Sequence, residues 1–213
     1  MPNTRPLLET AAYRRCADDR VGEDSYGVPF TAKLRKRLDR DVGGQLNVRI
    51  DSRTRLQDGA TAGGAIWFAD PSMLLRHLRD GLTTEEYRIK LADYETFRRI
   101  SYTNYVTLFK AKGVRLVVLT VHTCCAVVRQ FIPDMSLTDE RAFLRDTLRN
   151  GAAFFRERHP SVTIVGYKVD IEDAHDGRIL GMRHVLTYGP EINWDLPEND
   201  ASLRASMPPP DVD

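Results

Sequence analysis

The run VRLVVLTV at residues 114–121 constrains the fold more than any other stretch of this chain. It is continuously apolar and rich in β-branched residues, as is typical of parallel strands that are buried on both faces. Gly113 comes directly before it and marks the end of a preceding helix. The run therefore predicts a central strand in a sheet that carries helices on both faces.

Two other segments have strand patterns. Residues 45–50, QLNVRI, alternate between apolar and polar side chains, which is typical of a half-buried strand. Residues 162–171, VTIVGYKVDI, form a longer apolar segment. The sequence EDAHDGRI follows it and predicts a turn around Gly177 that leads into a short return strand.

Capping signals mark the helices between these strands. Asp70 before Pro71 provides an N-cap and a proline in the first helical turn. Thr83 and Glu86 have the spacing of a capping box, which starts a second helix. The predicted helices run from Asp70 to Gly81, from Thr83 onward, over about 102–111 and over about 138–158.

The alternation of strands and helices predicts an α/β fold with a mostly parallel central sheet flanked by helices. Its length of 213 residues is that of one domain, which we assign to residues 1–201. Residues 202–213, SLRASMPPPDVD, are expected to form a flexible tail. In such sheets the ligand-binding groups gather at the carboxyl ends of the strands.

The composition excludes several classes of function. A formal charge of +1, from 31 basic and 30 acidic side chains, favours neither a nucleic acid nor a membrane surface as a partner. No apolar run approaches the roughly 18 residues of a membrane helix, and no secretory signal is recognisable, so we expect a cytoplasmic protein. The three cysteines, two of them adjacent, are expected to be reduced thiols.

Polar residues with metal-binding chemistry follow the central strand. His122 and Cys125 stand three residues apart at its exit, and Cys16 can supply a third ligand. Two thiolates and one imidazole suit zinc, and three protein ligands leave a coordination position for water or substrate. A bound metal also lowers the pKa of its water. Taken singly, Cys124 and Cys125 are better explained by helix packing and Cys16 by a surface thiol than by a function.

Two ordered motifs in this chain resemble those of the β-class carbonic anhydrases. Cys16-Ala17-Asp18-Asp19-Arg20 is similar to that family's Cys-x-Asp-x-Arg, and His122-Thr123-Cys124-Cys125 is similar to its His-x-x-Cys. Three further segments resemble the context of these motifs. They are LNVRI (46–50), TNYVTLFKAKGVRLVVLTVHTCCAVV (103–128) and VTIVGYKVDIEDAHDGRI (162–179).

The resemblance implies a role for each motif residue. Cys16, His122 and Cys125 become the zinc ligands. Asp18 accepts a hydrogen bond from the zinc-bound water, and Arg20 pairs with Asp18. In some members of the family this Asp itself binds the metal, so a resting state with Asp18 on zinc stays open.

The chain also departs from the family pattern. The gap between the two motifs is long, which implies an inserted helical hairpin at about residues 70–100. Little apolar sequence precedes Cys16, and we expect the family's N-terminal helical arm to be missing. Cys124 replaces a frequent Asp and is a second candidate ligand beside Cys125. Asp19 replaces the usual Ser and adds a negative charge beside the site.

The resemblance implies an enzyme that reversibly hydrates carbon dioxide to bicarbonate and a proton, with Zn²⁺ as cofactor. Two alternatives stay open: hydrolysis of carbon disulfide or carbonyl sulfide at the same zinc site, and a non-catalytic structural relative. The partners expected from it are the small-molecule substrate and further copies of the chain, as a homodimer or a larger homo-oligomer.

Other polar stretches receive structural interpretations. DSRTR (51–55) is expected to be a solvated loop, and GATAGG (59–64) a turn, because it lacks the lysine and spacing of a phosphate loop. His175 and His184 lie in or after the return hairpin, where either is a candidate for proton export. The basic run KLRKRLDR (33–40) predicts the wet face of a short helix.

Overall fold

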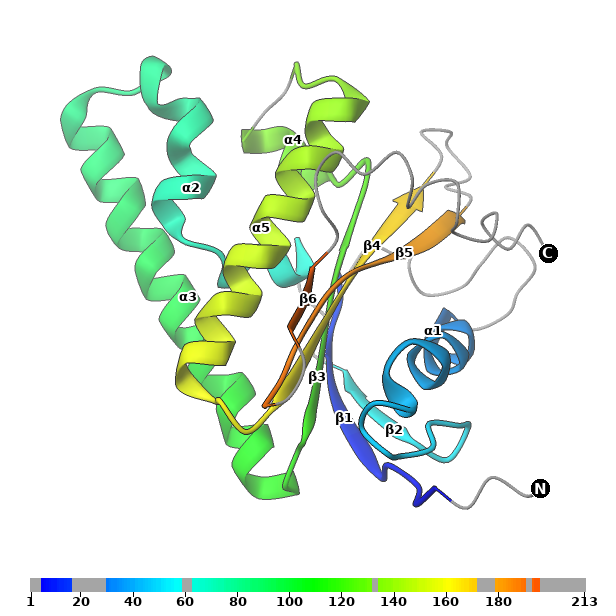
Figure 1. The fold of residues 1–213 in the computed structure, drawn as a ribbon. Coiled ribbons are helices and arrows are strands. Elements are labelled where there is room, and N and C mark those ends of the chain that lie inside the picture. The colour runs from blue at the N-terminus through cyan, green and yellow to red at the C-terminus, as the bar shows by residue number, and fades with distance from the viewer. Residues whose placement is uncertain are drawn as a thin grey trace.

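The computed structural model describes residues 5–16, 30–58, 63–131, 134–171, 179–190 and 193–195. Within these ranges one mixed sheet has the strand order β2-β1-β3-β4-β5-β6, with helices on both faces (Figure 1). The expected α/β class is therefore confirmed. The strands are β1 (Thr10–Arg14), β2 (Arg55–Asp58), β3 (Leu116–His122), β4 (Thr163–Ile171), β5 (Ile179–Tyr188) and β6 (Asn193–Asp195).

Among the described strands, the parallel pairs lie between β2 and β4 in the strand order. Strand β1 pairs in parallel with both β2 and β3, and β3 pairs in parallel with β4. Strands β5 and β6 extend the sheet beyond β4 with antiparallel pairing. All residues of β3 and β4 are buried, which confirms the two longest strand predictions. The predicted turn after β4 lies at residues 172–178, outside the described ranges.

Strand β1 was not predicted from the sequence. It has the sequence TAAYR, and Ala11, Ala12 and Tyr13 are completely buried between its neighbours and the helices. Two alanines give little apolar signal, yet their small side chains let helices pack closely on both faces of the strand. The position of β1 matters because the chain leaves it two residues before Cys16.

The predicted strand at 45–50 is wrong. Strand β2 begins instead at Arg55, the last residue of the expected loop at 51–55, and it was not predicted. Residues 45–50 make one isolated bridge, between Leu7 and Arg49, and otherwise turn back onto the preceding helix. There the Ile50 N–H donates to Asp39 Oδ1 over 2.8 Å, and the Val48 N–H donates to Gly43 O over 2.9 Å. Val48 and Ile50 are buried in the same core cluster as Leu34, Leu38 and Val42, so their alternation reflects core packing without pairing in the sheet.

Helices of unequal number cover the two faces of the sheet (Figure 1). Helix α1 (Phe30–Leu38) and the π-helical turn η2 (Asp39–Gly43) cover one face, where the basic run leaves Leu34 and Leu38 buried. The opposite face carries η3 (Gly64–Phe68), α2 (Pro71–Leu75), η4 (Arg76–Gly81), α3 (Thr84–Lys112), α4 (Ala126–Phe131) and α5 (Leu137–Arg158).

Helix α3 is one continuous helix, although its sequence pattern predicts two. The predicted capping box is present: the Thr83 N–H donates to Glu86 Oε2 over 2.8 Å, and the Glu86 N–H donates to Thr83 Oγ1 over 3.3 Å. No glycine or proline occurs between Thr84 and Lys112, so nothing interrupts the backbone hydrogen bonds. Gly113 follows with a positive φ of 59° and ends the helix.

The segments from α2 to α3 form a helical hairpin, whose two arms lie side by side in Figure 1. The Asp70 cap is confirmed by a 2.8 Å hydrogen bond from the Ser72 N–H, but the first arm is α-helical only to Leu75 and then continues as the 3-10 helix η4. The interpretation of this hairpin as an insertion at about residues 70–100 stays a prediction, as does the domain boundary at 201.

Helix α5 confirms the last predicted helix to within one residue. Ser136 caps it, since the Asp139 N–H donates to Ser136 Oγ over 3.2 Å. Phe143, Leu144, Leu148 and Phe155 are buried against the sheet as predicted. No helix in the described part of the chain combines the length and the apolar character that crossing a membrane requires.

Candidate metal centre

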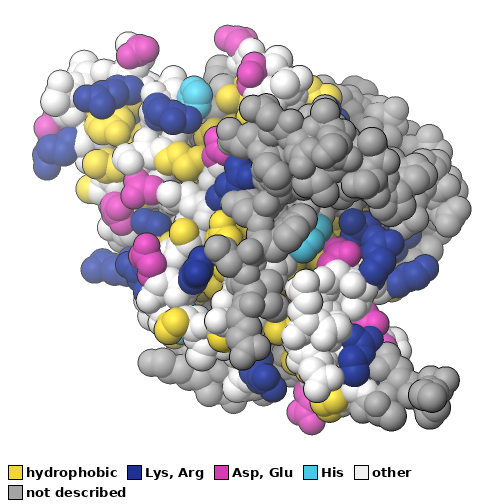
Figure 2. Space-filling model, viewed as in Figure 1, with side chains coloured by type: hydrophobic (Ala, Val, Ile, Leu, Met, Phe, Trp, Pro, Cys, Tyr) yellow, Lys and Arg dark blue, Asp and Glu magenta, His cyan; other side chains and the backbone are white. Residues whose placement is uncertain are grey.

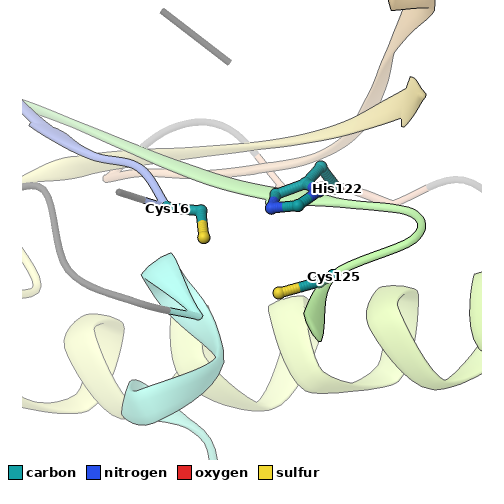
Figure 3. A group of neighbouring side chains, drawn as sticks. All are labelled: Cys16, His122 and Cys125. Carbon is teal, nitrogen blue, oxygen red and sulfur yellow. The ribbon is translucent and has the colours of Figure 1, made fainter. Parts of the chain in front are cut away.

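Cys16, His122 and Cys125 come together from three separate segments (Figure 3). Cys16 lies just beyond β1, His122 is the last residue of β3, and Cys125 directly precedes α4. The ligand atoms of the three side chains all lie within 4.8 Å of one another, and all three residues are buried. In Figure 3 the two sulfur atoms and the imidazole ring face a common space.

The parallel sheet explains why residues so distant in sequence meet. Strands β1 and β3 are neighbours with Arg14 opposite Leu119, so the residues after each strand emerge at the same edge. Cys16 and His122 therefore occupy the carboxyl edge, where parallel α/β sheets usually carry their ligand-binding groups. Asp18 and Arg20, the other two predicted site residues, lie outside the described ranges.

A hydrogen bond fixes the orientation of the His122 ring. Its Nδ1 lies 2.8 Å from the carbonyl oxygen of Thr123. Because a carbonyl oxygen can only accept, we assign the proton of the neutral ring to Nδ1, which leaves the lone pair on Nε2. Nε2 is buried. This is the tautomer of a histidine that binds a metal through Nε2, with its other nitrogen held by a backbone carbonyl.

The thiol of Cys16 receives a hydrogen bond from the loop before η3. The Gly63 N–H donates to Cys16 Sγ over 3.2 Å. The next residue, Gly64, has a φ of 59° and lies so close to the backbone of Cys16 that a β-carbon there would be 2.6 Å from the Cys16 nitrogen. The double glycine, which in the sequence predicts only a turn, thus supports the first ligand.

Cys125 is held by the start of α4 and by Cys16. The hydrogen bond with Cys16, followed by burial, raises the pKa of the Cys125 thiol far above its usual range, while hydrogen bonds from the Val128 and Val127 N–H groups lower it. Two adjacent buried thiols cannot both ionise without a compensating positive charge. A bound cation supplies that charge, and the backbone donors then stabilise both thiolates.

The loop between β3 and α4 directs Cys125, and not Cys124, toward the other ligands. Cys124 adopts the left-handed conformation with a φ of 58°, and its thiol donates to the carbonyl oxygen of Ile171 over 3.6 Å. Thr123 anchors the same loop to β4, because its Oγ1 accepts from the Ile171 N–H over 2.8 Å. Of the two candidate ligands, Cys125 is the one that belongs to the group of described residues that could hold a metal ion.

Glu140, on the first turn of α5, is a part of this site that was not predicted from the sequence. Its side chain is buried, and the backbone N–H groups of Cys125 and Cys124 donate to one side of its carboxylate, while its Oε1 has no hydrogen-bond partner among the described residues. Burial raises the pKa of Glu140, and these two hydrogen bonds oppose the rise. An acidic residue in the first turn of a helix is common, so its sequence position gave no signal of a contact with the loop.

The donor set and its surroundings fit a metal ion. Two sulfur atoms and one imidazole nitrogen suit zinc or another borderline-soft divalent cation, and three protein ligands are the number found in catalytic zinc sites. Each of the three ligand side chains has hydrogen bonds with backbone groups, which favour the thiolate of each cysteine and the Nδ1-protonated ring of His122. The fold and the site thus define an α/β protein with a buried Cys-His-Cys group, which can hold a metal ion, at the carboxyl edge of its parallel strands.

Comparisons of the chain with protein-family models, with curated proteins and with solved structures find no match in any of the three. The similarity to the β-class carbonic anhydrases therefore rests on the two motifs and the three context segments quoted above.

The face seen in Figure 2 shows basic and acidic side chains interspersed, as the near-neutral composition suggests.

Proposed function

We propose that Cys16, His122 and Cys125 bind one zinc ion and that the protein catalyses the reversible hydration of carbon dioxide to bicarbonate and a proton. The observation that carries the proposal is the convergence of the three ligand atoms within 4.8 Å at the carboxyl edge of the sheet. A bound zinc ion supplies Lewis acidity, which lowers the pKa of a water ligand toward neutrality.

The residues of the chain have distinct roles in this proposal. The thiolates of Cys16 and Cys125 and the Nε2 atom of His122 hold the metal, with the ring of His122 kept in place by the Thr123 carbonyl. Asp18 accepts a hydrogen bond that orients the attacking water, and Arg20 keeps Asp18 ionised, as the resemblance implies. Burial of all three ligands favours a small substrate over a polymer.

The proposal is tested by stopped-flow assays of the zinc-loaded protein. Hydration of carbon dioxide faster than in buffer alone, and its loss in Cys16→Ser, are the expected results. Sulfide release from carbonyl sulfide or carbon disulfide, without hydration of carbon dioxide, would instead identify a hydrolase at the same site. A zinc-loaded protein inactive toward all three substrates would contradict the proposal of an enzyme.

The expected homo-oligomer stays a prediction, which light scattering during size-exclusion chromatography tests.

A further inference from the structure

A buried carboxylate lies beneath the metal-binding loop. Glu140 is only 5% exposed, although it belongs to the first turn of α5, where acidic side chains usually point into solvent. The Glu140 N–H bonds to the Ser136 carbonyl over 2.8 Å, so the cap of the helix fixes its backbone. From this position the side chain reaches the backbone N–H groups of Cys124 and Cys125.

The loop needs an acceptor at this place. Cys124 has a φ of 58°, a conformation in which residues other than glycine are uncommon. Buried N–H groups that leave a regular strand at such a turn require hydrogen-bond partners, because an unpaired one costs roughly 1–3 kcal/mol. A buried carboxylate is itself costly, so packing alone does not explain Glu140, since an apolar side chain of similar size would fill the same volume.

Glu140 and strand β4 hold the loop on two sides. On one side the Thr123 N–H donates to the Val169 carbonyl over 3.0 Å, and Thr123 Oγ1 donates to the Ile171 carbonyl over 3.2 Å. On the other side Glu140 accepts from the residue in the left-handed conformation and from Cys125, the ligand itself. The loop that carries Cys125 is thus held between β4 and α5.

We propose that Glu140 is a positioning residue of the metal centre. By accepting the N–H groups of Cys124 and Cys125, it holds Cys124 in the left-handed conformation and thereby directs the sulfur of Cys125 toward Cys16 and His122. This inference rests on the proposed binding of a metal by those three residues. Partners of this kind, which orient the ligands without touching the metal, typically change metal affinity by about 10- to 100-fold.

Cobalt(II) titration tests this role, because cobalt reports both affinity and coordination geometry through its visible spectrum. The variants are Glu140→Leu, which removes the acceptor, Glu140→Gln, which retains one acceptor oxygen, and Asp139→Asn as a control. Asp139 lies in the same helical turn and is exposed, so the control removes a neighbouring negative charge without removing the loop contact.

The expected result is a loss of cobalt affinity of about 10- to 100-fold in Glu140→Leu, with a changed d–d spectrum. Glu140→Gln should show a smaller loss with the wild-type spectrum, and Asp139→Asn should behave as wild type. A purely structural role would lower the denaturation midpoint of the metal-free protein and leave the spectrum of the cobalt-loaded folded protein unchanged, which would overturn the inference.

The variants and the wild type separate two kinds of failure. If the wild type binds cobalt and Glu140→Leu binds it with the same affinity and spectrum, the role of Glu140 is refuted while the metal centre stands. If Glu140→Leu does not fold, Glu140→Gln decides. The proposal that an acceptor oxygen at residue 140 holds the loop would be refuted by wild-type cobalt affinity with an altered spectrum. It would also be refuted by a loss of cobalt affinity as large as that of Cys125→Ser. If the wild type binds neither cobalt nor zinc, the proposed function fails together with this inference.

Discussion

The backbone N–H of Gly63 donates a hydrogen bond of 3.2 Å to the sulfur of Cys16. The contact joins the start of η3 to the first ligand of the candidate metal centre, and Gly64 brings the two backbones together. A hydrogen bond from an N–H group stabilises a thiolate more than a thiol. The double glycine therefore contributes to metal binding as well as to the fold.

Gly64→Ala should destabilise the protein far more than Gly113→Ala. Both glycines have a φ of 59°, so alanine meets the same backbone strain of about 1–2 kcal/mol at either position. At Gly64 the new β-carbon collides with the backbone of Cys16, whereas at Gly113 no described residue beyond the adjoining chain lies within 4 Å of it. We expect an additional loss of about 1–3 kcal/mol for Gly64→Ala.

Urea denaturation of the two variants measures this difference, and zinc content after purification measures its effect on the site. Gly113→Ala should retain wild-type zinc. Equal free energies of unfolding for the two variants would show that the close approach of Gly64 to Cys16 is not present in solution.

Cys125→Ser should lose the metal, and Cys124→Ser should retain it. The two positions are adjacent, but the Cys125 sulfur lies in the three-residue group and the Cys124 thiol faces the Ile171 carbonyl. Serine at 124 can still donate to that carbonyl, so the loop keeps its anchor. Zinc analysis of both variants, purified in parallel without chelator, checks the assignment. Loss of zinc from Cys124→Ser alone would reverse it.

Asp18→Asn should bind zinc and lose hydration activity. In the proposed function Asp18 orients water and does not hold the metal, so its replacement leaves the three ligands intact. The expected decrease in kcat/KM is at least about 10²-fold, as is typical of a lost general acid–base or orienting group. Stopped-flow assays at equal zinc occupancy measure it. Unchanged kcat/KM would remove Asp18 from the proposed mechanism.

His184 should make the protein less stable in mild acid. Burial lowers the pKa of its imidazole, and a hydrogen bond with Thr187 Oγ1 of 2.7 Å holds the ring against the sheet. As the pH falls below about 6.5, the unfolded chain takes up this proton first, so the free energy of unfolding decreases. His184→Gln should reduce the decrease between pH 7.5 and 5.5. An identical decrease in both proteins would contradict the assignment.

The sequence predicted those parts of the site that depend on local signals. The buried run that became β3 and the cap of α5 are visible within a few residues of sequence, and the two motifs supplied Cys16, His122 and Cys125. Their grouping was implied by the resemblance, because the strand before Cys16 was not recognised. In the structure it follows from the parallel pairing of β1 and β3, which end at the same edge of the sheet. Asp18 and Arg20 stay predictions.

The features that the sequence did not predict depend on tertiary contacts. Strand β1 is marked by only two alanines, and Val48 and Ile50 alternate as a strand does although they belong to no strand and are buried in the core. The contact of Gly63 with Cys16 and that of Glu140 with the loop both cross long stretches of chain. Neither glycine pairs nor acidic residues in a first helical turn are specific enough to indicate such partners.

X-ray absorption spectroscopy at the zinc edge tests the central claim most directly, when it is combined with the zinc content of the protein purified without chelator. We predict about one zinc ion per chain, bound by two sulfur atoms at about 2.3 Å and one imidazole nitrogen at about 2.0 Å, with a further light-atom ligand. The two-sulfur shell should be lost in Cys16→Ser. A protein that folds without zinc and does not take it up, or a zinc ion without two sulfur ligands, would contradict the proposed metal centre.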